Sequence, residues 1–150
     1  MNLKTLILFL LINPLTYNID GLKIENKELR RYTLEYLEYL DVYGIDYNRQ
    51  QIINVRFNAL IGFGISGLSY GMNDDSYVLV FINPTYWVKM DDNQKRWLIY
   101  HELTHDIFNL PHYCTPIMEP IAPRRDQAND NIDLKIRDLF LTIKRKTQKK

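Results

Sequence analysis

Apolar and polar residues follow a helical spacing in two long segments of this chain. From Asn26 to Gly44, leucine and tyrosine recur every three or four residues with charged residues between them, which predicts an amphipathic helix that ends at the glycine. A second helix is predicted from residue 92 to residue 108 or 109. Asp91 and Gln94 have the residue types and the spacing of a capping box at the start of this helix.

The remaining segments predict a small sheet and a third helix. Apolar and polar positions alternate over residues 51–60, as in a half-buried strand, and residues 77–82 are continuously apolar, which predicts a central strand buried on both faces. Four glycines between residues 62 and 71 indicate a loop or an irregular strand. Apolar residues recur again from Ile132 to Ile143 and predict an amphipathic helix, followed by a basic tail over residues 143–150. This order of elements predicts an α+β fold.

Length and composition restrict the class of protein. A chain of 150 residues fits one domain, and its 46% hydrophobic and 25% charged residues are ordinary for a globular protein. The formal net charge of +1 gives no general attraction to nucleic acid or to an anionic membrane, so we expect neither as a partner. The single cysteine, Cys114, excludes an intramolecular disulfide framework and a cysteine-rich zinc module.

The N-terminus has the pattern of a targeting segment. Lys4 precedes an apolar run from Leu6 to Ile12, and Asn13 and Pro14 follow it, which predicts a secretory signal peptide over residues 1–20 and a secreted or extracytoplasmic protein. The run is shorter than the roughly 20 apolar residues that span a bilayer, so we expect no stable membrane span. A buried N-terminal element of a cytosolic protein is the alternative. Residues 21–150 then form the single domain, which we expect to be monomeric.

All three histidines of the chain lie between residues 101 and 112. His101 and His105 are four residues apart on the second predicted helix, so both imidazoles can be directed at one point. Neutral imidazole is a common zinc ligand. Glu102 is displaced about 100° around the helix from His101, where it can act as a general base without binding the metal. This H-E-x-x-H pattern predicts a zinc peptidase site with two ligands and one base on a rigid helix.

A catalytic zinc site takes three protein ligands and keeps one position open. His112 is the candidate for the third ligand, because Asn109 tolerates the left-handed conformation that would turn the chain back toward the helix. Glu119 is the competing candidate. If Cys114 or Glu119 instead provides a fourth ligand, the protein is a non-catalytic module that zinc stabilises. A peptide-binding module on the same fold is a further alternative, although it would have no use for Glu102.

Three neighbours of the histidines have two interpretations each. Asp106 could orient a metal ligand, or it could be a solvated charge. Tyr113 could assist at the reacting carbonyl, but simple packing is our expectation in a chain with eleven tyrosines. Cys114 could bind metal, but we expect an inert buried thiol.

These residues resemble the metzincin metallopeptidases, whose pattern is H-E-x-x-H-x-x-G-x-x-H followed by a turn that carries a methionine beneath the metal. The segment HELTHDIFNLPH is similar to the first part, and Pro116–Met118 is similar to the methionine turn. The chain departs from the family in three places. Thr104 replaces the glycine of the usual form HELGH, residues 108–109 occupy the place of the helix-ending glycine, and one additional residue precedes His112. This longer spacing is similar to that of small metallopeptidase-like proteins of bacteria and phages.

The resemblance implies a metzincin-like fold over most of residues 26–125, with a twisted mixed sheet, a metal-bearing helix beneath it and a C-terminal helix. It implies a Zn2+-dependent peptidase that acts on a peptide or protein substrate, with a zinc-activated water and Glu102 as the general base. Met118 would form a hydrophobic floor beneath the ligands. Residues 67–72 are our candidate for the edge strand that pairs with substrate backbone, because glycines permit close approach; an ordinary bulge or loop is the alternative.

Overall fold

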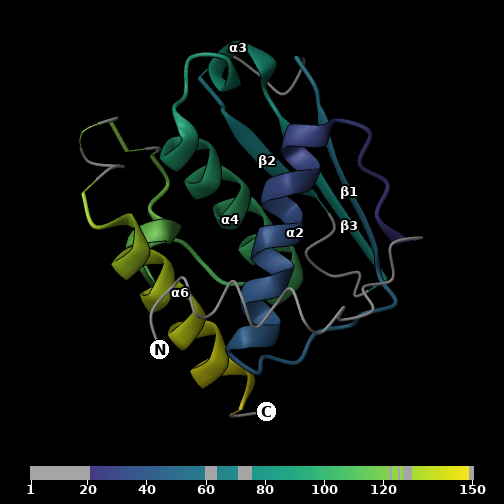
Figure 1. Ribbon diagram of the computed structural model, residues 1–150, viewed down its shortest axis with the longest axis vertical. Helices are drawn as coiled ribbons and strands as arrows, with labels where there is room; N and C mark the ends of the chain where they lie inside the picture. Colours follow the sequence, from purple (N-terminus) through teal and green to yellow (C-terminus); the bar gives the residue numbers. More distant parts are fainter. Residues whose placement is uncertain are drawn as a thin grey trace.

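The structure is a computed structural model that describes residues 21–59, 64–70, 76–121, 123–124, 126 and 130–148; the predicted signal peptide, residues 1–20, lies outside the described residues. A small sheet and four helices make up a mixed α and β architecture in this part of the chain (Figure 1). The elements are α2 (Lys27–Val42), β1 (Ile52–Phe57), β2 (Gly67–Tyr70), β3 (Tyr77–Ile82), α3 (Pro84–Trp87), α4 (Asp92–Phe108), the 3-10 turn η2 (Pro116–Met118) and α6 (Ile132–Thr147). None of the described helices has the length and apolar character needed to cross a membrane.

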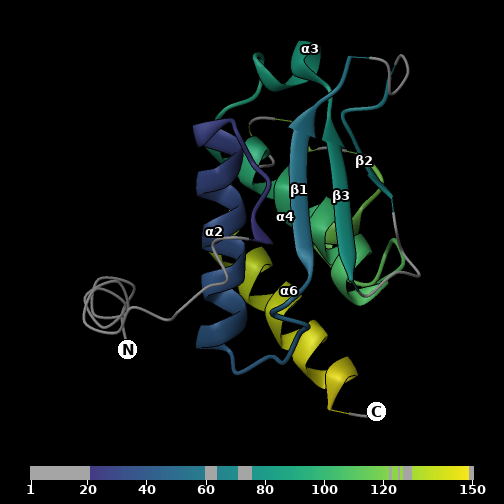
Figure 2. The same cartoon turned by 90° about the vertical axis from the view of Figure 1, so that its right-hand side faces the viewer.

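The three strands form a mixed sheet in the order β1-β3-β2. β3 is the central strand, as predicted, and it pairs in parallel with β1 and antiparallel with β2. Burial alternates along β3: Val78, Val80 and Ile82 are buried, whereas the three residues between them are only half-buried. The prediction of burial on both faces is therefore wrong. Among the described elements, the helices cover one face of the sheet only (Figure 2).

The glycine-containing segment forms an edge strand in part. Gly67–Tyr70 is β2, which has β3 as its only partner among the described residues. The predicted edge strand is thus confirmed for residues 67–70, and residues 71 and 72 lie outside the described part of the chain. This edge lies against α4, which carries the histidine motif.

Helix α2 has the boundaries that the sequence predicts. The Asn26 side chain accepts hydrogen bonds from the backbone N–H groups of residues 28 and 29, at 3.0 and 3.1 Å, and so caps the first turn. At the other end, Gly44 has a φ of 62°, and the Ile45 N–H donates to the Leu40 carbonyl at 2.9 Å. This bond and a positive φ at the glycine are the features of a Schellman motif. A residue with a side chain would strain the backbone at this position.

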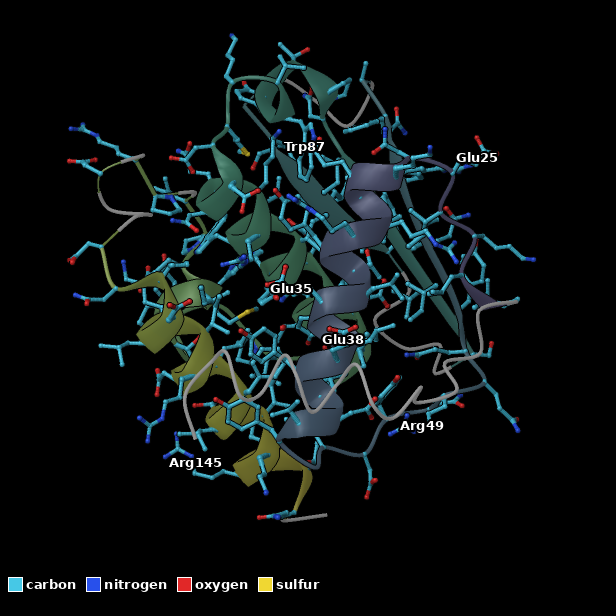
Figure 3. The ribbon with its side chains drawn as sticks, in the orientation of Figure 1. Glu25, Glu35, Glu38, Arg49, Trp87 and Arg145 are labelled. Atoms are coloured by element: carbon cyan, nitrogen blue, oxygen red, sulfur yellow. The ribbon has the colours of Figure 1, made fainter. Side chains whose placement is uncertain are left out.

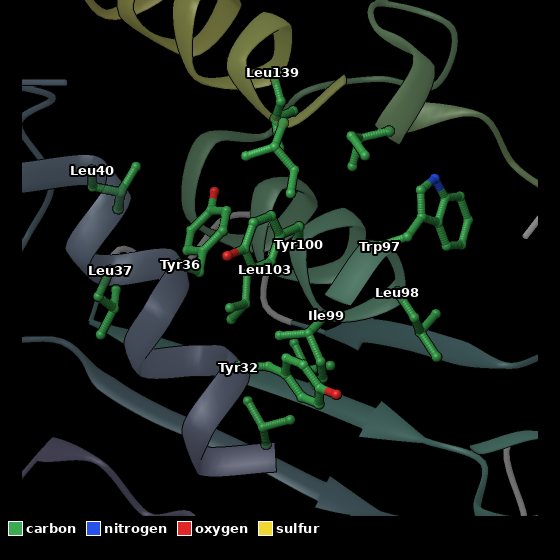
Figure 4. Close-up of a cluster of buried hydrophobic side chains, with 14 of the residues drawn as sticks. Tyr32, Tyr36, Leu37, Leu40, Trp97, Leu98, Ile99, Tyr100, Leu103 and Leu139 are labelled. Carbon is green, nitrogen blue, oxygen red and sulfur yellow. The ribbon is translucent and has the colours of Figure 1, made fainter. Parts of the chain in front are cut away.

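The core lies between α2, α4 and α6 on one side and the sheet on the other (Figure 4). The rings of Tyr36, Tyr100 and Phe140, one from each of the three helices, have centroids 5.2 to 5.9 Å apart. Glu35 of α2 (Figure 3), which is half-buried, forms an ion pair of 3.0 Å with Arg96 of α4. Aromatic packing and an ion pair thus fix α4 against α2.

The C-terminal helix is longer than the apolar pattern predicts. α6 continues to Thr147, so residues 143–147 are helical where we expected a basic tail. Ile143 is fully buried, and this burial explains why the helix does not end before the basic residues. Leu134 belongs to the apolar set that predicted the helix, but it is 59% exposed.

Thr104 occupies the motif position at which the metzincin pattern has a glycine, and it faces α2. Its hydroxyl oxygen lies 2.9 Å from the Tyr36 hydroxyl oxygen, and both groups are buried. We expect Thr104→Ala to lower the free energy of unfolding by about 1–3 kcal/mol, because it leaves the buried Tyr36 hydroxyl without this partner. Urea unfolding would measure the loss. Metal content should stay at the wild-type level, and a loss of metal would contradict a purely structural role for Thr104.

Candidate metal centre

Helix α4 is fixed at both ends, which sets the positions of its histidines. At the start, Asp91 accepts the Gln94 N–H at 2.9 Å and the Gln94 side chain accepts the Asp91 N–H at 3.1 Å, so the predicted capping box is confirmed. At the end, Asn109 has the left-handed conformation that we predicted, with φ 51° and ψ 40°. Its N–H donates to the His105 carbonyl at 3.0 Å. The chain then reverses and returns toward the helix.

This reversal brings all three histidines together. The ring centroids of His101 and His105 are 4.6 Å apart, and that of His112 lies 5.2 Å and 4.6 Å from them. One ring nitrogen from each residue lies within 4.8 Å of the other two. His101 is buried, His105 is half-buried and His112 is exposed. The cluster therefore has a buried side on the helix and an open side at the turn.

Backbone carbonyls determine which nitrogens face the centre of the cluster. The Ile117 carbonyl lies 2.8 Å from His101 Nδ1, and the Leu110 carbonyl lies 2.7 Å from His105 Nδ1. A carbonyl oxygen only accepts, so each Nδ1 carries the proton and each Nε2 presents a lone pair. The two Nε2 atoms are 3.1 Å apart. Two lone pairs at this distance repel each other, and a cation between them removes the repulsion.

Burial keeps these imidazoles neutral. Burial lowers the pKa of His101 to about 4, although the hydrogen bond to the Ile117 carbonyl by itself raises this pKa. Burial also lowers the pKa of His105. A proton shared between the two rings is therefore disfavoured at neutral pH, and a metal ion is the cation that suits the cluster. Two nitrogens on a tetrahedral zinc ion lie about 3.3 Å apart, close to the separation of the two Nε2 atoms.

Glu102 lies one residue from His101 and is buried, with 6% of its surface exposed. Burial raises the pKa of its carboxyl to about 8, and the nearby Asp106 charge also raises it, whereas a hydrogen bond from the Ser69 backbone lowers it. β2 holds this carboxylate closely. A Cβ atom built on Gly67 would stand 2.6 Å from Glu102 Oε1, which is less than a van der Waals contact. Only glycine fits at residue 67 while Glu102 keeps this position.

Two further buried side chains belong to the elements that position the histidines. Met118 of η2 is fully buried beside Ile117, whose carbonyl accepts from His101. The Trp97 ring is stacked on the His101 ring, with centroids 4.9 Å apart and planes inclined by 29°. Our sequence analysis did not identify Trp97, although it lies four residues before His101, on the same face of the helix. The sequence predicted Gly67 only as part of the candidate edge strand, because glycine permits close backbone approach. No sequence signal links Gly67 to Glu102.

Asp106 connects α4 to the sheet. It is buried, so the interpretation as a solvated charge is wrong, and its carboxylate accepts the Leu79 N–H of β3 at 3.0 Å. Tyr113 is also placed differently from the expectation: it is 73% exposed, so simple packing is wrong. The Cys114 thiol is half-buried, and burial raises its pKa. Neither Cys114 nor the exposed Glu119 belongs to the histidine cluster in the described part of the chain.

The cluster opens into a cleft of about 730 Å³ between β2, α4 and the turn after α4. Its lining includes the three histidines, Glu102, residues 64–69, Pro120 and Ile121. Among the described residues that line the cleft, Glu102 is the only one with an acidic or basic side chain besides the histidines. The site thus combines a three-imidazole cluster, a buried carboxylate and a cleft with largely apolar walls.

Comparison with known proteins supports the chemical class that this geometry suggests. No curated protein and no solved structure matches the chain. A protein-family model described as "Putative phage metallopeptidase" matches residues 55–109. This segment includes β2, β3, His101, Glu102 and His105, and it ends before His112. Over this segment the chain is similar to that family, and together with the three-histidine cluster the match supports a metallopeptidase-like protein that holds a metal ion.

Proposed function

We propose that the protein is a zinc-dependent endopeptidase. The observation that carries this proposal is the pair of Nε2 atoms of His101 and His105, 3.1 Å apart with their lone pairs directed at each other. Backbone carbonyls at both Nδ1 atoms hold this arrangement. Metal ligation commonly uses histidines whose second nitrogen donates to a carbonyl in this way. The resemblance of residues 101–112 to the metzincin pattern, and of residues 116–118 to its methionine turn, favours zinc as the metal.

His101, His105 and His112 would hold the metal. Bound zinc supplies a Lewis acid that lowers the pKa of a water molecule to about 7 and polarises a carbonyl group. His112 is exposed and lines the cleft, so the side of the cluster that His112 forms is accessible from the cleft. A substrate carbonyl can approach from this side.

Glu102 would act as the general base. Its carboxylate lines the cleft beside His101, and the Ser69 backbone holds it in place. From this position it accepts a proton from the attacking water at a carboxylate oxygen and then donates the proton to the nitrogen of the departing amine. Its buried environment favours the protonated form, which helps the second transfer, whereas a cation beside it favours the carboxylate required for the first.

The cleft suits an internal peptide bond. Exopeptidases need a charged partner for the free amino or carboxyl terminus of the substrate. Besides the three histidines and Glu102, the described lining of this cleft has no basic or acidic side chain. β2 borders the cleft and can add an extended substrate segment along its edge. The alternative of a closed, structural zinc site needs a fourth protein ligand. Among the described residues, neither Cys114 nor Glu119 joins the cluster as this fourth ligand.

Replacing His112 tests the metal site. We expect the purified wild type to bind one zinc ion per chain, and His112→Ala to bind zinc more weakly by several orders of magnitude, because two imidazoles remain where three are needed. Metal analysis after dialysis against a weak chelator measures this, and circular dichroism checks that the variant is folded. Hydrolysis of a mixed peptide library is followed in parallel.

Glu119→Ala is the matched control, because Glu119 was the competing ligand and is exposed. This variant should keep its zinc. If Glu119→Ala loses zinc and His112→Ala keeps it, the ligand assignment is wrong. If the wild type binds zinc but cleaves no peptide in the library, the metal site stands and the peptidase activity does not.

A further inference from the structure

A second pocket, the Tyr113 pocket, adjoins the metal cleft. It has a volume of about 460 Å³, and its walls comprise Tyr113, three prolines (Pro116, Pro120 and Pro123), Trp97, Ile121, Glu119 and Lys135. Trp97, Pro120 and Ile121 also line the metal cleft. The two spaces are therefore neighbours with a shared border, and Pro120 and Ile121 lie on this border.

Tyr113 has an unfavourable backbone conformation for an exposed aromatic residue. Its φ is 62°, in the left-handed region, and its N–H donates to the Met118 carbonyl at 3.0 Å. Glycine or asparagine would adopt this conformation more easily. The side chain gains little from the fold, because it is 73% exposed. Strain of this kind concentrates at functional positions, and Tyr113 directly follows the proposed ligand His112.

The walls of the pocket indicate what it binds. Ile121 is 80% exposed on the shared border, and the three prolines offer no backbone N–H donors. Apolar surface that is already exposed favours a large apolar ligand group, and a tyrosine ring favours an aromatic one. The volume is in the lower range for small-ligand pockets and accommodates one large side chain.

We propose that the Tyr113 pocket is a specificity site for an aromatic side chain of the peptide substrate. This residue would lie within about four positions of the bond that is cleaved, because Trp97, Pro120 and Ile121 line both spaces and an extended chain advances about 3.3 Å per residue. The inference rests on the proposed peptidase function for its substrate, but the pocket can bind an aromatic group without hydrolysis.

The cleavage test uses the zinc-loaded full chain and a proteome-derived peptide library analysed by mass spectrometry. The wild type should enrich phenylalanine, tyrosine or tryptophan at one position within about four residues of the cut. Tyr113→Ala should lose this enrichment and lower kcat/KM for an enriched peptide about tenfold, mainly through KM. Its zinc content and its rate on a peptide truncated before the aromatic residue should be unchanged. Val88→Ala, which removes a side chain that is 75% exposed after α3, is the control and should keep the wild-type profile.

A binding test separates failure of the pocket from failure of the peptidase function. N-acetylphenylalaninamide is titrated into wild type, Tyr113→Ala and Val88→Ala, and the indole N–H signals are followed by NMR. The Trp97 signal should shift in wild type and Val88→Ala and should shift much less in Tyr113→Ala. Cleavage without an aromatic preference, or equal Trp97 shifts in all three proteins, would overturn the specificity site. If no peptide is cleaved but the Trp97 shift depends on Tyr113, the pocket stands and the proposed function fails.

Discussion

Glu102→Gln is expected to leave zinc binding intact and to reduce peptide hydrolysis by about 10²–10⁴-fold, the usual contribution of general acid–base catalysis. Glutamine has nearly the shape of glutamate, and its side-chain oxygen can still accept from the Ser69 backbone, so the side chain should stay in place. It cannot accept a proton from water at neutral pH. The loss should therefore appear in kcat, while KM changes little.

The measurement compares zinc content and steady-state kinetics on one peptide cleaved by the wild type. Glu25→Gln is the control, because Glu25 is an exposed glutamate in the segment before α2 (Figure 3) and does not line the cleft. Glu25→Gln should behave as the wild type does. Full activity in Glu102→Gln would refute the base assignment. Loss of zinc in this variant would mean that Glu102 maintains the metal site instead.

Gly67→Ala should also abolish most of the activity, although it adds a single methyl group to a residue of β2 and none to the helix that carries His101 and His105. The new Cβ would stand 2.6 Å from Glu102 Oε1 and 2.9 Å from Leu98 Cδ1, so the carboxylate or the strand must move. A displacement of about 1 Å of a reacting group can cost about 10²-fold in rate. The crowding should also lower the free energy of unfolding by about 1–3 kcal/mol. Zinc content should not change.

A double-mutant cycle determines whether this effect acts through Glu102. If Gly67→Ala misplaces the base, it should cost about 10²-fold in the wild type and little in the Glu102→Gln background, where no base remains to be misplaced. Equal losses in both backgrounds would show that Gly67 acts on something other than the base, such as substrate pairing with β2. Thermal unfolding of all four proteins separates these effects from instability.

Glu102→Gln and Gly67→Ala change the two residues of one contact between α4 and β2. Glu102 lies on α4, and Gly67 lies on the edge strand β2, so the proposed base and the proposed substrate-binding strand touch each other directly. This arrangement places the base against the strand that would hold the substrate backbone. A shift of β2 would therefore change both substrate position and proton transfer.

The sequence alone determined the course of α2 and α4 and the chemistry that α4 carries. The capping box at Asp91 and Gln94 and the left-handed turn at Asn109 depend on contacts between residues close in sequence, and local patterns record such contacts well. The spacing of His101 and His105 fixes their common face for the same reason. His112 lies beside these two histidines because the chain reverses its direction at Asn109, only three residues earlier.

The sequence did not determine contacts between distant segments. The closeness of Gly67 to Glu102 and the sharing of Trp97 by two pockets depend on how β2 and the loop after α4 pack on α4. The half-buried face of β3 was predicted wrongly because apolar composition does not tell which face of a sheet the helices cover. The helical course of residues 143–147 depends on Ile143, whose burial only tertiary packing decides. Local hydrogen bonds thus fixed the proposed metal-binding helix, and long-range packing fixed the cleft around it.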